Sequence, residues 1–203
     1  IRETDRMLVL SCEQFTYVFN KLTGLFDKMT FANEPLLDQP MGFNVWRAPT
    51  DNDRKLKADW YAAHYDHAAT NAYHTEYTVT ASGVTLHTHV GIAAICVQKF
   101  LDLDVTWTVA NNGSVDLALH AQRNTVFPEL PRFGLRLFLP QEMSQVNYYG
   151  MGPMECYCDK HHAASHNSYT ATVWQLHEDY IRPQENGSHF DCDYVMLAGD
   201  AVR

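Results

Sequence analysis

The sequence predicts an all-β protein, a large antiparallel β-sandwich with one short helix. Three observations support this fold class: apolar and polar residues alternate along many short segments, turn-forming residues separate these segments at near-regular spacing, and a single segment has helical periodicity. Hydrophobic residues make up 46% of the 203 residues, which is enough to form a core. Because no repeat or linker interrupts the pattern, residues 1–203 are expected to form a single domain.

The clearest strand pair covers residues 101–121. Apolar and polar side chains alternate over residues 101–109, as expected of a half-buried strand. The apolar positions are Leu101, Leu103, Val105, Trp107 and Val109. The turn sequence Asn-Asn-Gly follows at 111–113 and alternation resumes over residues 115–121, so the two segments are predicted to form a hairpin.

Similar patterns predict the remaining elements. Further strands are expected at Met7–Ser11 and at residues 14–19, 76–80, 84–90 and 134–139. A strand is also expected at 43–47, where the apolar run precedes a polar cluster. The one helical segment covers 55–65 and would place Leu56, Trp60 and Ala63 on one face.

The totals argue against two classes of protein. A net charge of −9 and a pI near 5.6 argue against nucleic-acid binding, which needs a surplus of Lys and Arg. No apolar run reaches the roughly 18–20 residues that cross a bilayer, so no membrane partner is expected. Five cysteines, an odd number, do not indicate a disulfide framework and favour a reducing, cytoplasmic location. Since the first residue is Ile1, the chain is interpreted as a processed or excised piece.

The most polar stretch of the sequence contains Asp51, Asn52 and Asp53, and three interpretations of it stay open. The side chains could bind a hard cation, but the adjacent Arg54 and Lys55 would repel a cation, and the oxygen ligands of a calcium loop are not spaced in this way. They could cap the helix that is expected to start near Arg54, by accepting its free backbone N–H groups. They could also line a polar binding site.

Histidines and cysteines offer a second candidate metal site. His87 and His89 lie two residues apart on a predicted strand, so both rings would point to one face. A further group comprises Cys156, Cys158, His161, His162 and His166. Its spacing does not match the C-x₂-C pairs of known zinc sites, so surface histidines are the preferred interpretation.

The carboxylates do not define a catalytic pair. Glycoside hydrolysis needs two carboxylates across the sugar, and the sequence alone pairs no two of the glutamates at that separation. Those available are Glu129, Glu142, Glu155, Glu178 and Glu185. Each is interpreted as a surface or loop carboxylate. A G-x-S-x-G elbow, which would indicate a catalytic serine, does not occur in the sequence.

Two late segments combine aromatic residues with turn residues. Residues 147–159 read NYYGMGPMECYCD, in which Gly150, Gly152 and Pro153 are interpreted as a tight turn that places backbone where side chains would clash. Residues 180–187 read YIRPQENG and are interpreted as an aromatic strand end that turns through Pro183 and Asn186-Gly187. Aromatic rings beside Asn, Glu and Arg are the side chains that bind sugars, although turn residues next to core aromatics explain the pattern equally well.

Four segments in this order resemble the C-terminal domain of the large β-galactosidases of glycoside hydrolase family 2, which in some bacteria is part of a separate small chain. They are WRAPTDND at 46–53, LPRFGLRL at 130–137, YYGMGPMECYCDK at 148–160 and RPQENG at 182–187. The resemblance covers most of the chain, and four linked motifs are more specific than any one of them. It implies a large antiparallel β-super-sandwich of the galactose-mutarotase-like kind.

The resemblance also implies what this chain lacks. In the family both catalytic glutamates lie on a (β/α)₈ barrel in another domain, so no catalytic residue, metal ligand or cofactor is expected here, and Mg²⁺ or Na⁺ would bind elsewhere in the enzyme. The implied partners are that barrel portion and a galactoside at the shared site. Asp51, Asn52, Asp53 and Arg54 are implied to lie at the rim of the substrate pocket. Because the family domain continues past Arg203, a C-terminal truncation is expected, and its exposed edge strands would favour an oligomer.

The sequence therefore predicts the C-terminal non-catalytic domain, or the small subunit, of a β-galactosidase that hydrolyses terminal β-D-galactosides in carbohydrate metabolism. One alternative is a stand-alone carbohydrate-binding module, since such modules also use β-sandwiches with aromatic platforms. The other is a mutarotase-like epimerase, whose acid–base residues would be drawn from His120, His177 and Glu185.

Overall fold

The computed structural model describes residues 1–182 and 184–199. The chain divides into two compact units: unit 1 consists of Ile1–Arg47 and Leu56–Leu139, and unit 2 consists of Ala48–Lys55 and Pro140–Arg203. Both units are built on antiparallel sheets, and the described residues include one short α-helix, which confirms the predicted all-β fold class. The expectation of a single domain stays a prediction. No helix among the described residues is both long and apolar enough to span a membrane.

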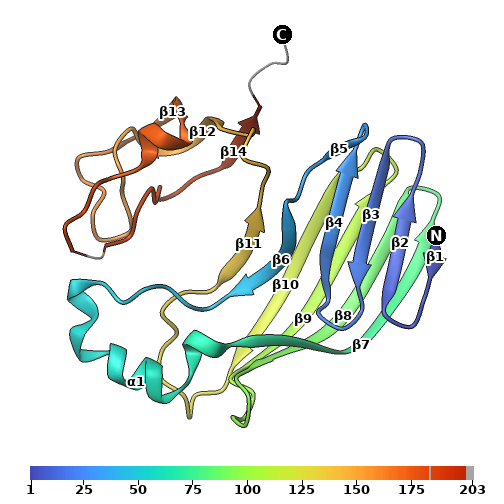
Figure 1. Ribbon diagram of the computed structural model, residues 1–203, viewed down its shortest axis with the longest axis horizontal. Coiled ribbons are helices and arrows are strands. Elements are labelled where there is room, and N and C mark those ends of the chain that lie inside the picture. Colours follow the sequence, from blue (N-terminus) through green and yellow to red (C-terminus); the bar gives the residue numbers. More distant parts are fainter. Residues whose placement is uncertain (183, 200–203) are drawn as a thin grey trace. The chain divides into compact units, whose positions relative to one another are not determined.

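Unit 1 is a sandwich of two antiparallel sheets (Figure 1). The first sheet consists, in spatial order, of β1 (Arg2–Glu3), β2 (Met7–Ser11), β3 (Phe15–Asn20), β4 (Leu25–Phe31) and β5 (Glu34–Pro35). The second consists of β10 (Val115–Arg123), β9 (Leu101–Ala110), β8 (Gly83–Ala93) and β7 (Ala69–Thr80). A separate strand pair joins β6 (Gln39–Asn44) to β11 (Gly134–Phe138).

The inner faces of the two sheets form the core of unit 1. Along β9 the five apolar positions predicted from the sequence are at most 2% exposed, because alternate side chains of a strand point to opposite faces. The Trp107 ring meets the Phe26 ring edge to face, with centroids 5.3 Å apart. Trp107 Nε1 also donates a hydrogen bond of 3.0 Å to the Gly24 carbonyl oxygen, which satisfies the buried indole N–H. Trp107 therefore joins the second sheet to the β3–β4 turn of the first.

The predicted hairpin at 101–121 is confirmed. β9 and β10 pair antiparallel along their whole length, from the Val115–Val109 pair to the Arg123–Leu101 pair. In the turn between them Gly113 has a φ of +86°, a conformation that favours glycine, and its carbonyl oxygen accepts a 2.8 Å hydrogen bond from the Tyr17 hydroxyl.

The strand predicted at 43–47 is wrong in its second half, because β6 ends at Asn44. The Asn44 side-chain oxygen accepts a 3.3 Å hydrogen bond from the backbone N–H of Trp46, which turns the chain away from the sheet. The Trp46 ring then packs on Tyr61, with centroids 5.2 Å apart. The chain therefore leaves the sheet before it reaches the polar cluster.

The predicted helix is shorter than expected. The α-helix α1 (Lys57–Ala62) lies between the 3₁₀ helices η1 (Asp51–Lys55) and η2 (Tyr65–His67). Trp60 and Ala63 are buried as predicted, but Leu56 is exposed, because the helix begins only after it. Within unit 1 Trp60 Nε1 donates a 3.0 Å hydrogen bond to the Glu129 carbonyl oxygen, so this ring fixes α1 against the loop before β11.

Unit 2 contains a three-stranded antiparallel sheet. Its strands, in spatial order, are β13 (Ser165–Thr172), β12 (Gln145–Gly152) and β14 (Tyr194–Ala198), and the 3₁₀ helix η3 (Val173–Leu176) follows β13. The turn predicted over Gly150–Pro153 begins later than expected, because Gly150 and Gly152 lie in β12 and the chain bends only at Pro153 and Met154. The predicted close approach is correct, since a Cβ atom at Gly150 would collide with Cys192 and one at Gly152 with Tyr148.

Candidate functional site

The predicted rim residues Asp51, Asn52, Asp53 and Arg54 all lie in η1, within unit 2. Asp53 is only 6% exposed, and its Oδ2 accepts hydrogen bonds from the backbone N–H of Thr50 at 2.7 Å and from the Thr50 hydroxyl at 2.9 Å. These bonds close the turn, so the Asp53 carboxylate is engaged inside the unit. The other three side chains are exposed.

The prediction that Asp or Asn caps the following helix is wrong. The N-cap residue of α1 is Leu56, and no side chain makes a capping hydrogen bond there. The reason is that η1 is inserted between the acidic cluster and α1, so that Asp53 turns back to Thr50 instead of reaching the N–H groups of α1. The exposed side chains of η1 therefore make no capping hydrogen bonds to α1.

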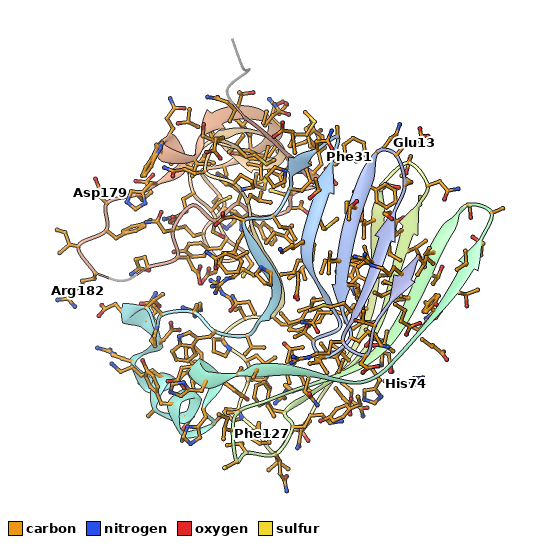
Figure 2. The ribbon with its side chains drawn as sticks, turned by 45° about the vertical axis from the view of Figure 1, so that its right-hand side comes forward. Glu13, Phe31, His74, Phe127, Asp179 and Arg182 are labelled. Carbon is orange, nitrogen blue, oxygen red and sulfur yellow. The ribbon has the colours of Figure 1, made fainter. Side chains whose placement is uncertain are left out.

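Asp51 is paired with an arginine from a distant part of the sequence. Arg182 Nη1 lies 3.1 Å from Asp51 Oδ1, although the two residues are 131 positions apart, and both belong to unit 2. The pair joins two of the segments that carry the family resemblance, the polar cluster at 51–53 and the RPQENG segment at 182–187. Arg182 and Asp179 project from the loop that follows η3 (Figure 2). An exposed ion pair stabilises a fold by only about 0–1 kcal/mol, so its main effect is to orient the two side chains.

Glu155 is, with Asp53, one of the buried carboxylates described in unit 2, and its side chain is only 3% exposed. Its Oε1 accepts hydrogen bonds from the Tyr180 hydroxyl and from Lys160 Nζ, the latter at 3.4 Å. Its Oε2 accepts the backbone N–H of Gly187 at 2.9 Å. The hydrogen bond to Glu155 raises the pKa of Tyr180, and the hydrogen bond to Tyr180 raises the pKa of Lys160, so the hydroxyl stays protonated and the ammonium charged at neutral pH.

These contacts close the loop 178–187 at its base. Tyr180 and Gly187, near its two ends, both donate to Glu155. The Asn186 side chain also bonds both backbone groups of Glu178, donating to its carbonyl oxygen at 2.6 Å and accepting from its N–H at 3.2 Å. We name this set of contacts the Glu155 clasp. The loop is not the strand end that the sequence predicted. Of the predicted turn, Pro183 lies outside the described residues, whereas the chain does bend at Gly187, which has a φ of +67°.

Sequence reasoning missed the Glu155 clasp. Glu155 was expected to be a surface or loop carboxylate, and its burial corrects that expectation. The two segments that meet in the clasp both combine aromatic with polar residues. No spacing rule, however, pairs Glu155 with a tyrosine 25 residues later or with the backbone N–H of Gly187. The only indication in the sequence that these two segments belong together is the family resemblance, which includes both of them.

The histidine and cysteine candidates are engaged in separate contacts. His87 Nδ1 lies 3.0 Å from the Thr106 hydroxyl, His89 pairs with Asp102, and the rings of His161 and His162 stack with centroids 4.9 Å apart. All five cysteines are free. Across residues 1–182 and 184–199, no group of three or more His, Cys, Asp or Glu side chains is arranged to hold a metal ion.

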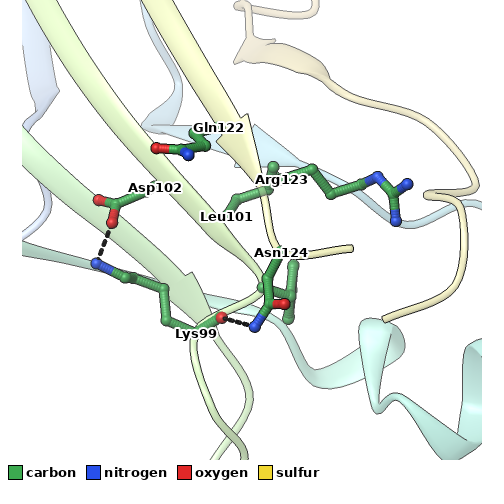
Figure 3. A pocket seen from close by; sticks show the side chains of 7 residues that line it. Lys99, Leu101, Asp102, Gln122, Arg123 and Asn124 are labelled. Atoms are coloured by element: carbon green, nitrogen blue, oxygen red, sulfur yellow. Dashed lines mark hydrogen bonds and ion pairs between the residues drawn. The ribbon is translucent and has the colours of Figure 1, made fainter. Parts of the chain in front are cut away.

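Unit 1 has a polar pocket at the ends of β9 and β10, with a volume of about 330 Å³ (Figure 3). It is lined by Lys99, Phe100, Leu101, Asp102, Gln122, Arg123 and Asn124. Its charged groups bind one another or nearby backbone: Asp102 is bonded to Lys99, and Arg123 donates at 2.7 Å both to the Phe127 carbonyl oxygen and to Glu129. None of the lining residues belongs to the four segments that carry the resemblance, so the pocket is a weaker candidate than the loops of unit 2.

The residues proposed for an epimerase are divided between the two units. His120 lies on β10 of unit 1, whereas His177 and Glu185 belong to unit 2. His177 Nε2 pairs with Asp179 Oδ1 at 3.2 Å.

The amino-acid sequence matches a known protein family. A family model described as the β-galactosidase small chain matches residues 11–201. The chain is 41% identical over 182 residues to a β-galactosidase of Actinobacillus pleuropneumoniae, which covers 90% of this chain and 18% of that protein. It is 35% identical over 199 residues to a β-galactosidase of Staphylococcus xylosus, covering 98% of this chain and 20% of the relative. The chain thus spans about a fifth of the length of the curated relatives it matches.

The Glu155 clasp predicts a selective loss of stability on neutralisation of this carboxylate. Glu155→Gln removes the charge that three donors share and turns an N–H group toward one of them, so the free energy of unfolding of unit 2 should fall by roughly 2–3 kcal/mol. Urea unfolding measures this change, and hydrogen exchange should increase over residues 178–187. Glu178→Gln is the matched control, because its carboxylate is exposed in the same loop. Equal behaviour of the two variants would contradict the role assigned to Glu155.

The Asp102 network predicts a loss of stability in acid. The hydrogen bond from Lys99, followed by that from His89, lowers the pKa of Asp102, and Asp104 is the other charge near His89. A lowered pKa stabilises the fold above the unfolded value of about 4 and loses that effect as the pH falls toward the folded pKa. Asp102→Asn should therefore flatten the decline in unfolding free energy below about pH 4, by at most about 1 kcal/mol. Urea titrations at a series of pH values test this, and Asp116→Asn, on the exposed side of β10, should leave the decline as steep as in the parent chain.

Proposed function

Because this chain belongs to the β-galactosidase small-chain family, we propose that it is the non-catalytic domain or small subunit of a β-galactosidase and contributes part of the rim of its galactoside pocket. The observation that carries the proposal is the Asp51–Arg182 pair, which brings two family-typical segments together on exposed loops of unit 2. A carboxylate and a guanidinium side by side offer both acceptors and donors, the groups that bind sugar hydroxyls. The rim residues of this proposal are Asp51, Asn52, Arg54 and Arg182, with Asp53 holding the turn.

Hydrolysis itself is proposed to use carboxylates outside this chain. A retaining glycosidase needs one carboxylate free to attack the sugar and one free to transfer a proton. The two buried carboxylates described in unit 2, Asp53 and Glu155, both accept internal hydrogen bonds, Asp53 from Thr50 and Glu155 from Tyr180 and Gly187. The proposed partner is the (β/α)₈-barrel portion of the same enzyme, with a β-galactoside at the shared site and an oligomer as the working form.

The metal and the location are part of the same proposal. Asp51 is neutralised by Arg182 and Asp53 is bonded to Thr50, so we place any Mg²⁺ or Na⁺ of the complete enzyme in another domain. Four of the five free cysteines are exposed, which fits a reducing compartment such as the cytoplasm.

The isolated 203-residue chain is expected not to hydrolyse a chromogenic β-galactoside. Turnover is measured after expression in a host without its own β-galactosidase, beside a mock purification as control. Activity above the mock would overturn the proposal. Titration of the same chain with galactose separates the binding-module alternative, because affinity in the millimolar range or tighter would favour a stand-alone module.

The rim proposal predicts a charge-swap result in the complete enzyme. Arg182→Asp places two like charges together and should raise KM for a galactoside roughly two- to five-fold with kcat nearly unchanged, because an exposed ion pair is worth only about 1 kcal/mol and acts on binding. The double variant Asp51→Arg with Arg182→Asp should recover most of the parent KM. A single variant with unchanged KM, or a double variant no better than the single, would count against the pair as a rim element.

A further inference from the structure

The loop 178–187 carries a fully exposed apolar side chain. Ile181 is 102% exposed, as open to solvent as in an extended peptide. Its neighbours Asp179 and Arg182 are also exposed (Figure 2). A single exposed apolar residue is ordinary on a protein surface, so the exposure becomes informative only through the way in which the loop is built.

The base of this loop is fixed. The Glu155 clasp holds Tyr180 and Gly187, and the Asn186 side chain bonds both backbone groups of Glu178. Ile181 therefore directly follows Tyr180, a residue that the Glu155 clasp anchors. A side chain next to an anchored residue loses less conformational entropy when it binds than one on a free end, which is the property of a docking element.

A small apolar pocket adjoins the base of the loop. It has a volume of about 200 Å³ and is lined by Met154, Glu155, Cys156, Lys160 and the stretch from His161 to Ala164. Glu155 and Lys160 belong both to this pocket and to the Glu155 clasp. Met154 is an exposed apolar residue at its edge. Unit 2 thus presents an apolar projection and an apolar recess that share two residues.

We propose that residues 178–182 form a docking element whose tip, the exposed Ile181 side chain, packs into the part of the β-galactosidase polypeptide that lies outside this chain. The proposal rests on the proposed function, since it requires a larger enzyme. The length of the relatives identifies the surface that would cover Ile181. The matched relatives are about five times longer than this chain, so most of such a polypeptide is available to pack against the loop. A sugar fits less well, because isoleucine offers neither a hydrogen-bonding group nor a flat ring. The complementary surface is an apolar recess that receives the Ile181 side chain.

Cysteine labelling tests the proposal. Ile181→Cys is introduced into the isolated chain and into the complete β-galactosidase polypeptide that carries it, and the rate of alkylation at this peptide is followed by mass spectrometry, which separates it from the five native thiols. We expect fast labelling in the isolated chain and labelling at least about tenfold slower in the complete enzyme, because a buried thiol reacts only after local opening. Val126→Cys, 87% exposed in unit 1, is the matched control and should react at nearly the same rate in both.

Three results would overturn the proposal. Equal rates for Ile181→Cys in the two proteins would show that the tip stays open. Slow labelling already in the dilute isolated chain would show that the chain itself covers the tip. Slowing that appears only when the isolated chain is concentrated would assign the tip to a second copy of this chain. None of these outcomes depends on galactoside turnover, so the proposed function can stand when the docking proposal fails.

Discussion

A buried carboxylate is stable only where donors replace the water that it has lost, and this requirement fixes the loops of unit 2 around Glu155. The donors come from Lys160, a few residues further along, and from Tyr180 and Gly187 at the two ends of a loop. The same loop carries Arg182 to its contact with Asp51. The position of the exposed ion pair therefore depends on a carboxylate that takes no part in it.

Different interactions stabilise the interior of each unit. Among the described residues, the main cluster of buried hydrophobic side chains lies entirely in unit 1, where Trp107 and Phe26 join the two sheets. The buried apolar residues of unit 2 are few, namely Val146, Tyr148 and Cys156. Because a small core contributes little hydrophobic stabilisation, the polar contacts of unit 2 must hold its loops, and each of those contacts is directional.

This difference explains how much could be predicted from the sequence. Alternation at 101–109 predicted a strand and its inner face, because burial on one side of a sheet imposes a period of two, and the burial of Trp107 bears this out. The Glu155 clasp has no such period, since its donors are a distant hydroxyl and a backbone N–H. The predicted helix cap is wrong for a related reason. Asp53 accepts a hydrogen bond from Thr50, which is nearer, and the donor that a carboxylate binds depends on local backbone geometry. The resemblance located the right segments without saying which of their atoms meet.

The loop 178–187 links the two proposals made for this chain. Ile181 and Arg182 are neighbours in the sequence, so a contact that fixes the tip also restricts the backbone from which Arg182 reaches Asp51. The exposed ion pair alone is too weak to hold that backbone, because solvent screens it and two long side chains must be ordered. An apolar contact at the tip, added to the Glu155 clasp at the base, would hold the loop at both ends. On the two proposals together, the rim would be complete only in the assembled enzyme, and one short loop would join substrate binding to assembly.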